Sequence, residues 1–97
     1  MNKIYVFRGH KVMLDSDLAE LYGIETKRLN EQVRRNLTRF PVDFMFTLTI
    51  QEFEILKSQN ATSSWGGRRS APNVFTEFGV LMLSSVINSE QTIQVSI

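Results

Sequence analysis

Residues 14–36 have the sequence LDSDLAELYGIETKRLNEQVRRN, which predicts two short helices joined by a tight turn. Ser16 or Asp17 can cap the first helix with a side-chain oxygen. Gly23 is expected to end it, because only glycine takes a left-handed backbone conformation there without strain. The apolar residues of this segment are expected to face the core: Leu18, Ala19, Leu21, Tyr22 and, after the turn, Ile24.

The second helix is predicted over residues 26–38, with the hydroxyl of Thr26 as its cap. Leu29, Val33 and Leu37 recur every four residues and are expected to form its inward face. The pair therefore has the pattern of a helix-turn-helix with a basic outer helix. The remaining polar side chains are expected on the outside: Lys27, Arg28, Asn30, Glu31, Arg34, Arg35 and Thr38.

Three positions agree with the spacing of a helix-turn-helix: Ala19 in the first helix, Gly23 in the turn and Leu29 in the second helix. The pattern also requires an apolar residue at position 32, where this chain has Gln32, and Val33 follows one step late. We therefore expect a second helix that is rotated or lengthened relative to the common form. An ordinary αα-hairpin with solvated outer charges is the alternative.

Composition limits the class of protein. A length of 97 residues fits one small domain, and without cysteine the chain has neither a disulfide nor a thiolate metal site. No apolar run approaches the ~18 residues of a membrane span, and the start of the chain lacks the apolar core of a signal peptide. These features predict a cytoplasmic protein with no membrane partner.

The charges are segregated along the chain although the net charge is only +1. Residues 24–40 carry five cations against two acids, and residues 65–73 add two arginines without an acid. One positive side is typical of a nucleic-acid-binding surface, whereas a solvated charged face is the alternative. The cations of these two segments are Lys27, Arg28, Arg34, Arg35, Arg39, Arg68 and Arg69.

Strands are predicted on both sides of the helix pair. Residues 4–7 and 12–14 predict a β-hairpin that leads directly into the first helix. Residues 43–48 predict a strand with aromatic residues on both faces, which we expect to be central in the sheet. Residues 73–75 can pair with residues 44–46.

A third helix and a long loop are predicted next. Thr49 and Glu52 form a capping box that opens a helix ending near Ser58. Residues 59–73 have turn composition throughout, and a loop of this length in a small domain is typically functional or disordered. A DNA-contacting wing that presents Arg68 and Arg69, and a flexible connector, are equally compatible with it.

The last helix is predicted over residues 77–87, capped by Thr76 and apolar on nearly all sides. Gly79 in its interior indicates that another backbone packs closely there. Residues 92–97 alternate between polar and apolar and are expected to form an open strand, so that residues 76–97 are a candidate homodimer interface.

Catalytic chemistry is missing from the sequence. His10 is the single histidine and lies at a predicted turn, and neither a phosphate-binding loop nor a metal-ligand spacing is present. The acids of the first helix, Asp15, Asp17 and Glu20, are explained by capping and the helix dipole. We therefore expect no enzyme, no cofactor, no metal and no small-molecule substrate.

Four motifs in order resemble one family, over roughly residues 4–97: residues 12–23, 26–36, 39–49 and 75–85. The chain resembles the phage-type ORF-six N-terminal DNA-binding domain, a relative of the KilA-N and Bro-N domains. The resemblance implies a double-stranded DNA-binding domain of a transcriptional regulator or antirepressor, in a bacterial cell or phage-infected host. Many members carry glutamine where Phe78 stands. Members also continue into a C-terminal region, so this chain looks like the N-terminal part of a longer protein.

The prediction is a small single α+β domain over residues 1–97, with an N-terminal β-hairpin, a helix-turn-helix, a short sheet and two further helices, similar to a winged helix. The helix over residues 26–38 is expected in the major groove of DNA. A protein-interaction or dimerisation module without DNA contact is the alternative. The expected base-proximal residues are Thr26, Lys27, Arg28 and Asn30, followed on the same face by Glu31, with Arg34, Arg35, Arg39, Arg68 and Arg69 on phosphates.

Overall fold

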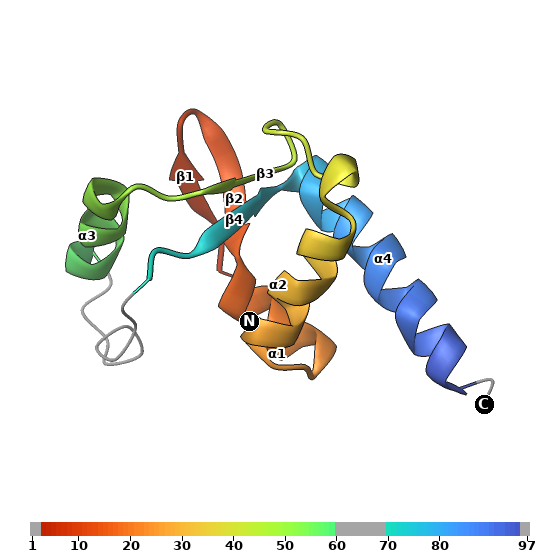
Figure 1. Ribbon diagram of the computed structural model, residues 1–97. Coiled ribbons are helices and arrows are strands. Elements are labelled where there is room, and N and C mark those ends of the chain that lie inside the picture. Colours follow the sequence, from red (N-terminus) through yellow and green to blue (C-terminus); the bar gives the residue numbers. More distant parts are fainter. Residues whose placement is uncertain (1–2, 60–69, 96–97) are drawn as a thin grey trace.

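The structure is a computed structural model that describes residues 3–59 and 70–95 (Figure 1). It confirms the predicted α+β class, with four helices and a four-stranded antiparallel sheet in the described part of the chain. The elements are β1 (Tyr5–Phe7), β2 (His10–Leu14), α1 (Asp15–Tyr22), α2 (Thr26–Arg35), the short 3₁₀ helix η1 (Leu37–Arg39), β3 (Met45–Thr47), α3 (Ile50–Gln59), β4 (Asn73–Thr76) and α4 (Glu77–Val95).

The strand order of the sheet is β1-β2-β4-β3. The predicted hairpin is β1–β2, and the predicted pairing of residues 44–46 with 73–75 is confirmed, with Met45 opposite Phe75 and Phe46 opposite Val74. The expected central position of residues 43–48 is wrong, because β3 is an edge strand of the described sheet and β4 lies in the interior. β3 carries apolar residues on both faces because helices cover the two faces of the sheet even at this edge.

The sheet separates two hydrophobic cores. On one face Met13, Met45 and Phe75 pack against α1, α2 and α4. On the other face Leu14 and its neighbours on β3 and β4 pack against Phe53 and Leu56 of α3. Figure 1 shows the same arrangement, with α3 on one side of the sheet and the other three helices together on the opposite side. The strict alternation of side chains along β2 and β4 therefore produces a three-layer domain.

The first helix differs from the prediction at its start and on its buried face. α1 begins at Asp15, and neither Ser16 nor Asp17 caps it, because Leu14 of β2 is the residue that precedes the first turn. Leu18 and Ala19 are buried, but Leu21 is 57% exposed, contrary to the prediction, because an eight-residue helix lying on the sheet turns only one side inward.

The turn between α1 and α2 confirms the prediction for Gly23. Its φ of 68° is left-handed, and its amide donates a hydrogen bond to the carbonyl of Glu20 at 3.1 Å. The amide of Ile24 donates to the carbonyl of Ala19 at 3.0 Å, so both amides satisfy the end of α1. The chain can therefore reverse in three residues and bring α2 against α1.

The second helix ends at Arg35, three residues before the predicted end at Thr38, and η1 follows. Leu37, expected in the inward face, is 57% exposed because the helix has already ended. The buried residues of α2 are Leu29, Gln32 and Val33, so position 32 is buried as the helix-turn-helix spacing requires although its side chain is polar. No rotation of α2 is therefore needed to bury position 32, and the helix is shorter than the predicted span of residues 26–38. Thr26 is the first helical residue and makes no side-chain cap.

The capping box of α3 is confirmed and is joined to the β1–β2 hairpin. The amide of Thr49 donates to Glu52 Oε1 at 2.8 Å, and the amide of Glu52 donates to Thr49 Oγ1 at 3.1 Å. Arg8, which has a left-handed φ of 54°, donates to both carboxylate oxygens of Glu52 at 3.1 and 3.0 Å. Its guanidinium also lies 4.3 Å from the centre of the Phe46 ring. The hairpin tip is thereby tied to the start of α3.

The last helix confirms the inference from Gly79. A Cβ atom at this position would lie 1.9 Å from the carbonyl oxygen of Phe44. Thr76 caps the helix as predicted, because its Oγ1 accepts from the amide of Gly79 at 3.4 Å. Residues 92–95 are helical, which contradicts the predicted open strand: α4 continues to Val95, and residues 96–97 lie outside the described residues.

Replacing Gly79 by alanine is expected to destabilise the fold by about 2 kcal/mol, a typical value for an overpacked core. Alanine is the better helix former by ~1 kcal/mol, but its Cβ collides with the Phe44 carbonyl that accepts a hydrogen bond from the Thr76 amide at 2.9 Å. Urea unfolding measures the effect. Gln51→Ala, at an exposed position of α3, is the control and should change stability by less than about 0.5 kcal/mol. A Gly79→Ala variant as stable as the parent would contradict the close contact.

The ion pair between Arg8 and Glu52 predicts a pH-dependent contribution to stability. The hydrogen bond from Arg8 lowers the pKa of the Glu52 carboxyl, an effect that burial opposes and the bonds to Thr49 reinforce. An acid with a lowered pKa stabilises the fold above its unfolded pKa of about 4.3, and this stability is lost as the pH falls through the folded pKa. Glu52→Gln should therefore be less stable than the parent at pH 7, with the difference closing below about pH 4. Glu54→Gln, at an exposed ion pair on the same helix, is the control in thermal unfolding; a gap for Glu52→Gln that does not change with pH would contradict the prediction.

Candidate nucleic-acid interface

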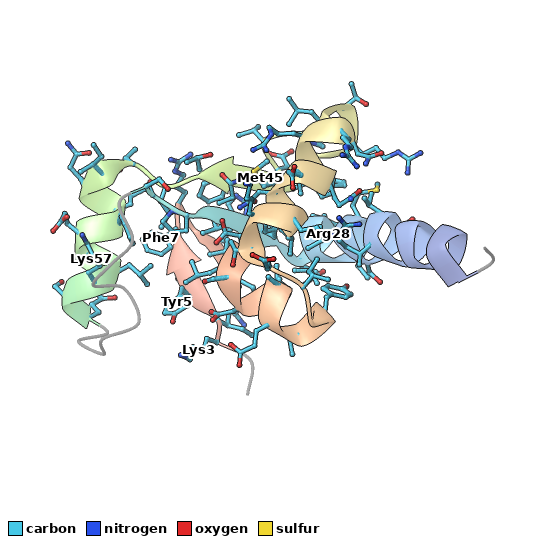
Figure 2. All side chains as sticks on the ribbon, turned by 60° about the horizontal axis from the view of Figure 1, so that its bottom comes forward. Lys3, Tyr5, Phe7, Arg28, Met45 and Lys57 are labelled. Carbon is cyan, nitrogen blue, oxygen red and sulfur yellow. The ribbon has the colours of Figure 1, made fainter. Side chains whose placement is uncertain are left out.

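The outward face of α2 is basic. Lys27, Arg28, Arg34 and Arg35 are exposed, and Glu31 lies half-buried among them. In an α-helix Lys27, Glu31 and Arg34 project from the side opposite Leu29 and Val33, which are buried against α1 and α4. Figure 2 shows Arg28 on α2 and Lys57 on α3 at opposite sides of the molecule. The cations of α2 therefore form a surface separate from α3.

Four cations of α2 and η1 are available to an external anion. Arg34 and Arg35 lie in the last turn of α2, where positive charge is favourable because of the helix dipole. Arg39 is exposed one turn further on, in η1, and Lys27 is exposed in the first turn of α2. Within residues 3–59 and 70–95, no ion pair involves any of these four side chains.

The predicted site also includes Thr26, Arg28, Arg68 and Arg69. Thr26 is half-buried in the first turn of α2, and Arg28 is exposed beside it. Arg68 and Arg69, and with them the expected wing, lie outside the described residues.

The predicted outward position of Asn30 is wrong. Asn30 is half-buried, its side-chain nitrogen donates to Asp15 Oδ2 at 3.0 Å, and its side-chain oxygen accepts from Asn73 Nδ2 at 3.0 Å. Asp15, interpreted from the sequence as a capping acid, is only 1% exposed and is the centre of these contacts. The sequence signal for this role is a charged residue directly after the buried strand β2. Capping and the helix dipole explain an acid at the same position, so this pattern alone does not reveal the buried role.

Asp17 behaves differently from Asp15 on the same helix. Burial raises the pKa of the Asp17 carboxyl, and the nearby Lys3 opposes that shift. Its Oδ2 atom is buried, and within the described residues it has no hydrogen-bond partner. The part of the chain that the structure describes holds no group of three or more acidic or histidine side chains arranged to bind a metal ion.

A second surface lies on α4. Phe78, Leu81, Met82 and Ser85 follow helical spacing and, with Phe44, line a groove of about 310 Å³. Phe78 and Leu81 are 56% and 68% exposed, and the ring of Phe78 stacks on that of Phe44 at a centroid distance of 5.8 Å. This apolar face has no counterpart on α2, where the outward residues are charged. Among the described residues, no helix is both long and apolar enough to cross a membrane.

Comparison with known proteins identifies a family for this chain. Residues 2–86 match the ORF6N domain, a span that contains the sheet, the α1–α2 pair and the first half of α4. No curated protein and no solved structure gives a significant match to the chain. Because the matched span covers most of the chain and all of its described strands, the chain belongs to the ORF6N domain family.

Proposed function

We propose that this chain is a double-stranded DNA-binding domain of a phage-type transcriptional regulator or antirepressor, in which α2 enters the major groove. The observation that carries the proposal is the set of exposed cations on the second helix of a helix-turn-helix pair. Lys27, Arg34 and Arg35 of this helix form no ion pair among the described residues. Membership of the ORF6N family supports a phage-type regulatory role.

The dimensions and chemistry of α2 suit this role. Its ten residues span about 15 Å, and a major groove about 12 Å wide admits an α-helix. Lys27 and Arg28 in the first turn are in the part of a recognition helix that reaches base edges, where arginine can bind guanine through two hydrogen bonds. Glu31, one turn later on the same face, can accept a hydrogen bond from cytosine.

Phosphate contacts are assigned to the other end of the helix. Arg34 and Arg35 lie in the last turn of α2, and Arg39 lies in η1. All three side chains are exposed. Such contacts orient a protein on the duplex without reading its sequence. The burial of Leu29 and Val33 against α1 and α4 keeps α2 on the domain with its charged side outward.

The salt dependence of binding tests this proposal. Fluorescence anisotropy with a labelled random duplex should give a slope of log affinity against log salt of roughly −3 to −6, because each neutralised phosphate contributes about −0.9. The double variant Arg34→Ala, Arg35→Ala should weaken binding and reduce the slope by about 1.8.

The matched control is Lys11→Ala, Lys57→Ala, which removes the same charge from the β1–β2 hairpin and α3. It should leave the slope within about 0.5 of the parent, because these residues make no phosphate contact in the proposed complex. Equal losses in both double variants would show that only net charge matters and would remove α2 from the interface. No binding by the parent at low salt would refute DNA binding altogether.

A second candidate function, self-association, is favoured by the apolar face of α4. We propose a second copy of this chain as the occupant of that face, because residues 78–89 contain no charged residue and two identical faces can therefore meet without like-charge repulsion. Ser85 is small enough to allow the close approach of two helices. Phe78 and Leu81 are 56% and 68% exposed, so a partner can reach this face without displacing α1 or α2.

Leu81→Glu should convert a dimer into a monomer, because it places a charge in the centre of the paired faces. Light scattering over a range of concentrations measures the mass, and Gln51→Glu on exposed α3 is the control for added charge. A parent protein that is monomeric at every concentration would exclude self-association through α4. A dimer that survives Leu81→Glu would place the contact elsewhere.

A further inference from the structure

A series of side-chain hydrogen bonds crosses the domain from β3 to α1 and passes through α2. Thr47 Oγ1 donates to Asn73 Oδ1 at 2.5 Å, and Asn73 Nδ2 donates to Asn30 Oδ1 at 3.0 Å. Asn30 Nδ2 then donates to Asp15 Oδ2 at 3.0 Å. The four residues belong to β3, β4, α2 and α1, so this series joins the sheet to both helices of the helix-turn-helix.

The direction of the series is set by the carboxylate at its end. A carboxylate only accepts hydrogen bonds, so Asn30 must turn its NH₂ group toward Asp15 and its oxygen toward Asn73. Asp15 also accepts from the amide of Ser16 at 2.7 Å and from the backbone amide of Asn73 at 3.2 Å. Bonds to a carboxylate are stronger than neutral ones, and a network with every member satisfied holds its geometry well.

We infer that Asp15 and Asn73, acting through Asn30, fix the rotation and position at which α2 presents its outward face to DNA. This inference rests on the proposed DNA-binding function and specifies its recognition geometry. Asn30 is then a positioning residue and does not read a base, because both polar atoms of its amide are engaged inside the domain.

The physical reason is that hydrogen bonds restrain the rotation of a helix more closely than apolar contacts do. Leu29 and Val33 are held by burial, which is non-directional, whereas the bonds of Asn30 require defined distances and angles. Asn30 lies one turn from the start of α2, next to Lys27 and Arg28. A small rotation of the helix there would displace these side chains from the base edges that they are proposed to reach.

The first measurement does not depend on DNA. Backbone amide resonances of residues 27–35 should shift in Asn73→Ala, and to a lesser extent in Thr47→Val, because both changes interrupt the series of hydrogen bonds outside α2. Gln51→Ala, which truncates an exposed amide on α3, is the control and should leave these resonances unchanged. If Asn73→Ala folds as the parent does but leaves the amide resonances of residues 27–35 unshifted, the inference is overturned. If Asn73→Ala does not fold, Thr47→Val, at an exposed position, decides in the same way.

The second measurement tests recognition. A duplex selected by the parent protein from a randomised library of about 20 bp, at about 100 mM salt, and a random duplex are the two probes. Asn30→Ala and Asn73→Ala should each weaken binding to the selected duplex by about fivefold, the size expected for one net hydrogen bond, with the salt slope unchanged. The double variant should be no weaker than either single variant, because the two residues act through one path.

Three outcomes are distinguishable. Losses that multiply in the double variant, with Asn30→Ala relaxing preference at a single base pair, would overturn the inference and make Asn30 a base-reading residue. Equal losses on the selected and random duplexes would also overturn it, because they would indicate a stability effect without a change in recognition. A parent protein that binds neither probe would refute the proposed function, while the resonance shifts would still decide whether the hydrogen bonds position α2.

Discussion

The fold depends on the burial of β4 on both of its faces. Val74 and Phe75 are adjacent and fully buried, yet they belong to different hydrophobic cores, because successive side chains of a strand point to opposite faces. β4 also pairs with β2 and β3, so it supplies hydrogen bonds on both edges. α1 leaves β2 and α4 leaves β4 directly, without a connecting loop. The positions of both helices therefore follow from the register of β2 against β4.

On that support, α2 combines two kinds of polar chemistry on different sides. Lys27, Arg34 and Arg35 are exposed and form no ion pair among the described residues, whereas Asn30 and Gln32 are directed toward the interior. In the proposed complex, a helix held only by apolar contacts would keep its outward charges near DNA but would not set them in register with base edges. The hydrogen bond that Asn30 donates to α1 and the one that it accepts from β4 provide the directional restraint that burial lacks.

Features indicated by residue type and periodicity could be predicted from the sequence, but the partners of most side chains in tertiary contacts could not. The turn at Gly23 and the capping box at Thr49 depend on neighbouring residues and are confirmed. The glycine inside the last helix indicated a close backbone approach, which is also confirmed, but it did not identify Phe44 as the partner. The α+β class follows from periodicity, and the pairing of residues 44–46 with 73–75, given as a possibility by the sequence, is confirmed by the structure. The predicted burial of Leu21 and Leu37 is wrong, because periodicity gives the faces of a helix but not which neighbour covers them or where the helix stops.

The candidate site shows the same division. The cations of α2 are visible in the sequence, but the partners of Asn30 lie 15 and 43 positions away, and no local pattern connects them.

The basic face of α2 and the apolar face of α4 belong to helices that pack into the same hydrophobic core. α2 and α4 share one core, in which Val33 of α2 and Leu83 and Val86 of α4 are buried together. A contact made through the opposite side of α4 would therefore fix the distance and angle between two copies of α2, which is what paired half-sites on DNA require. The proposed self-association and the proposed DNA binding would therefore not compete, because they would employ different sides of helices that are packed into one core.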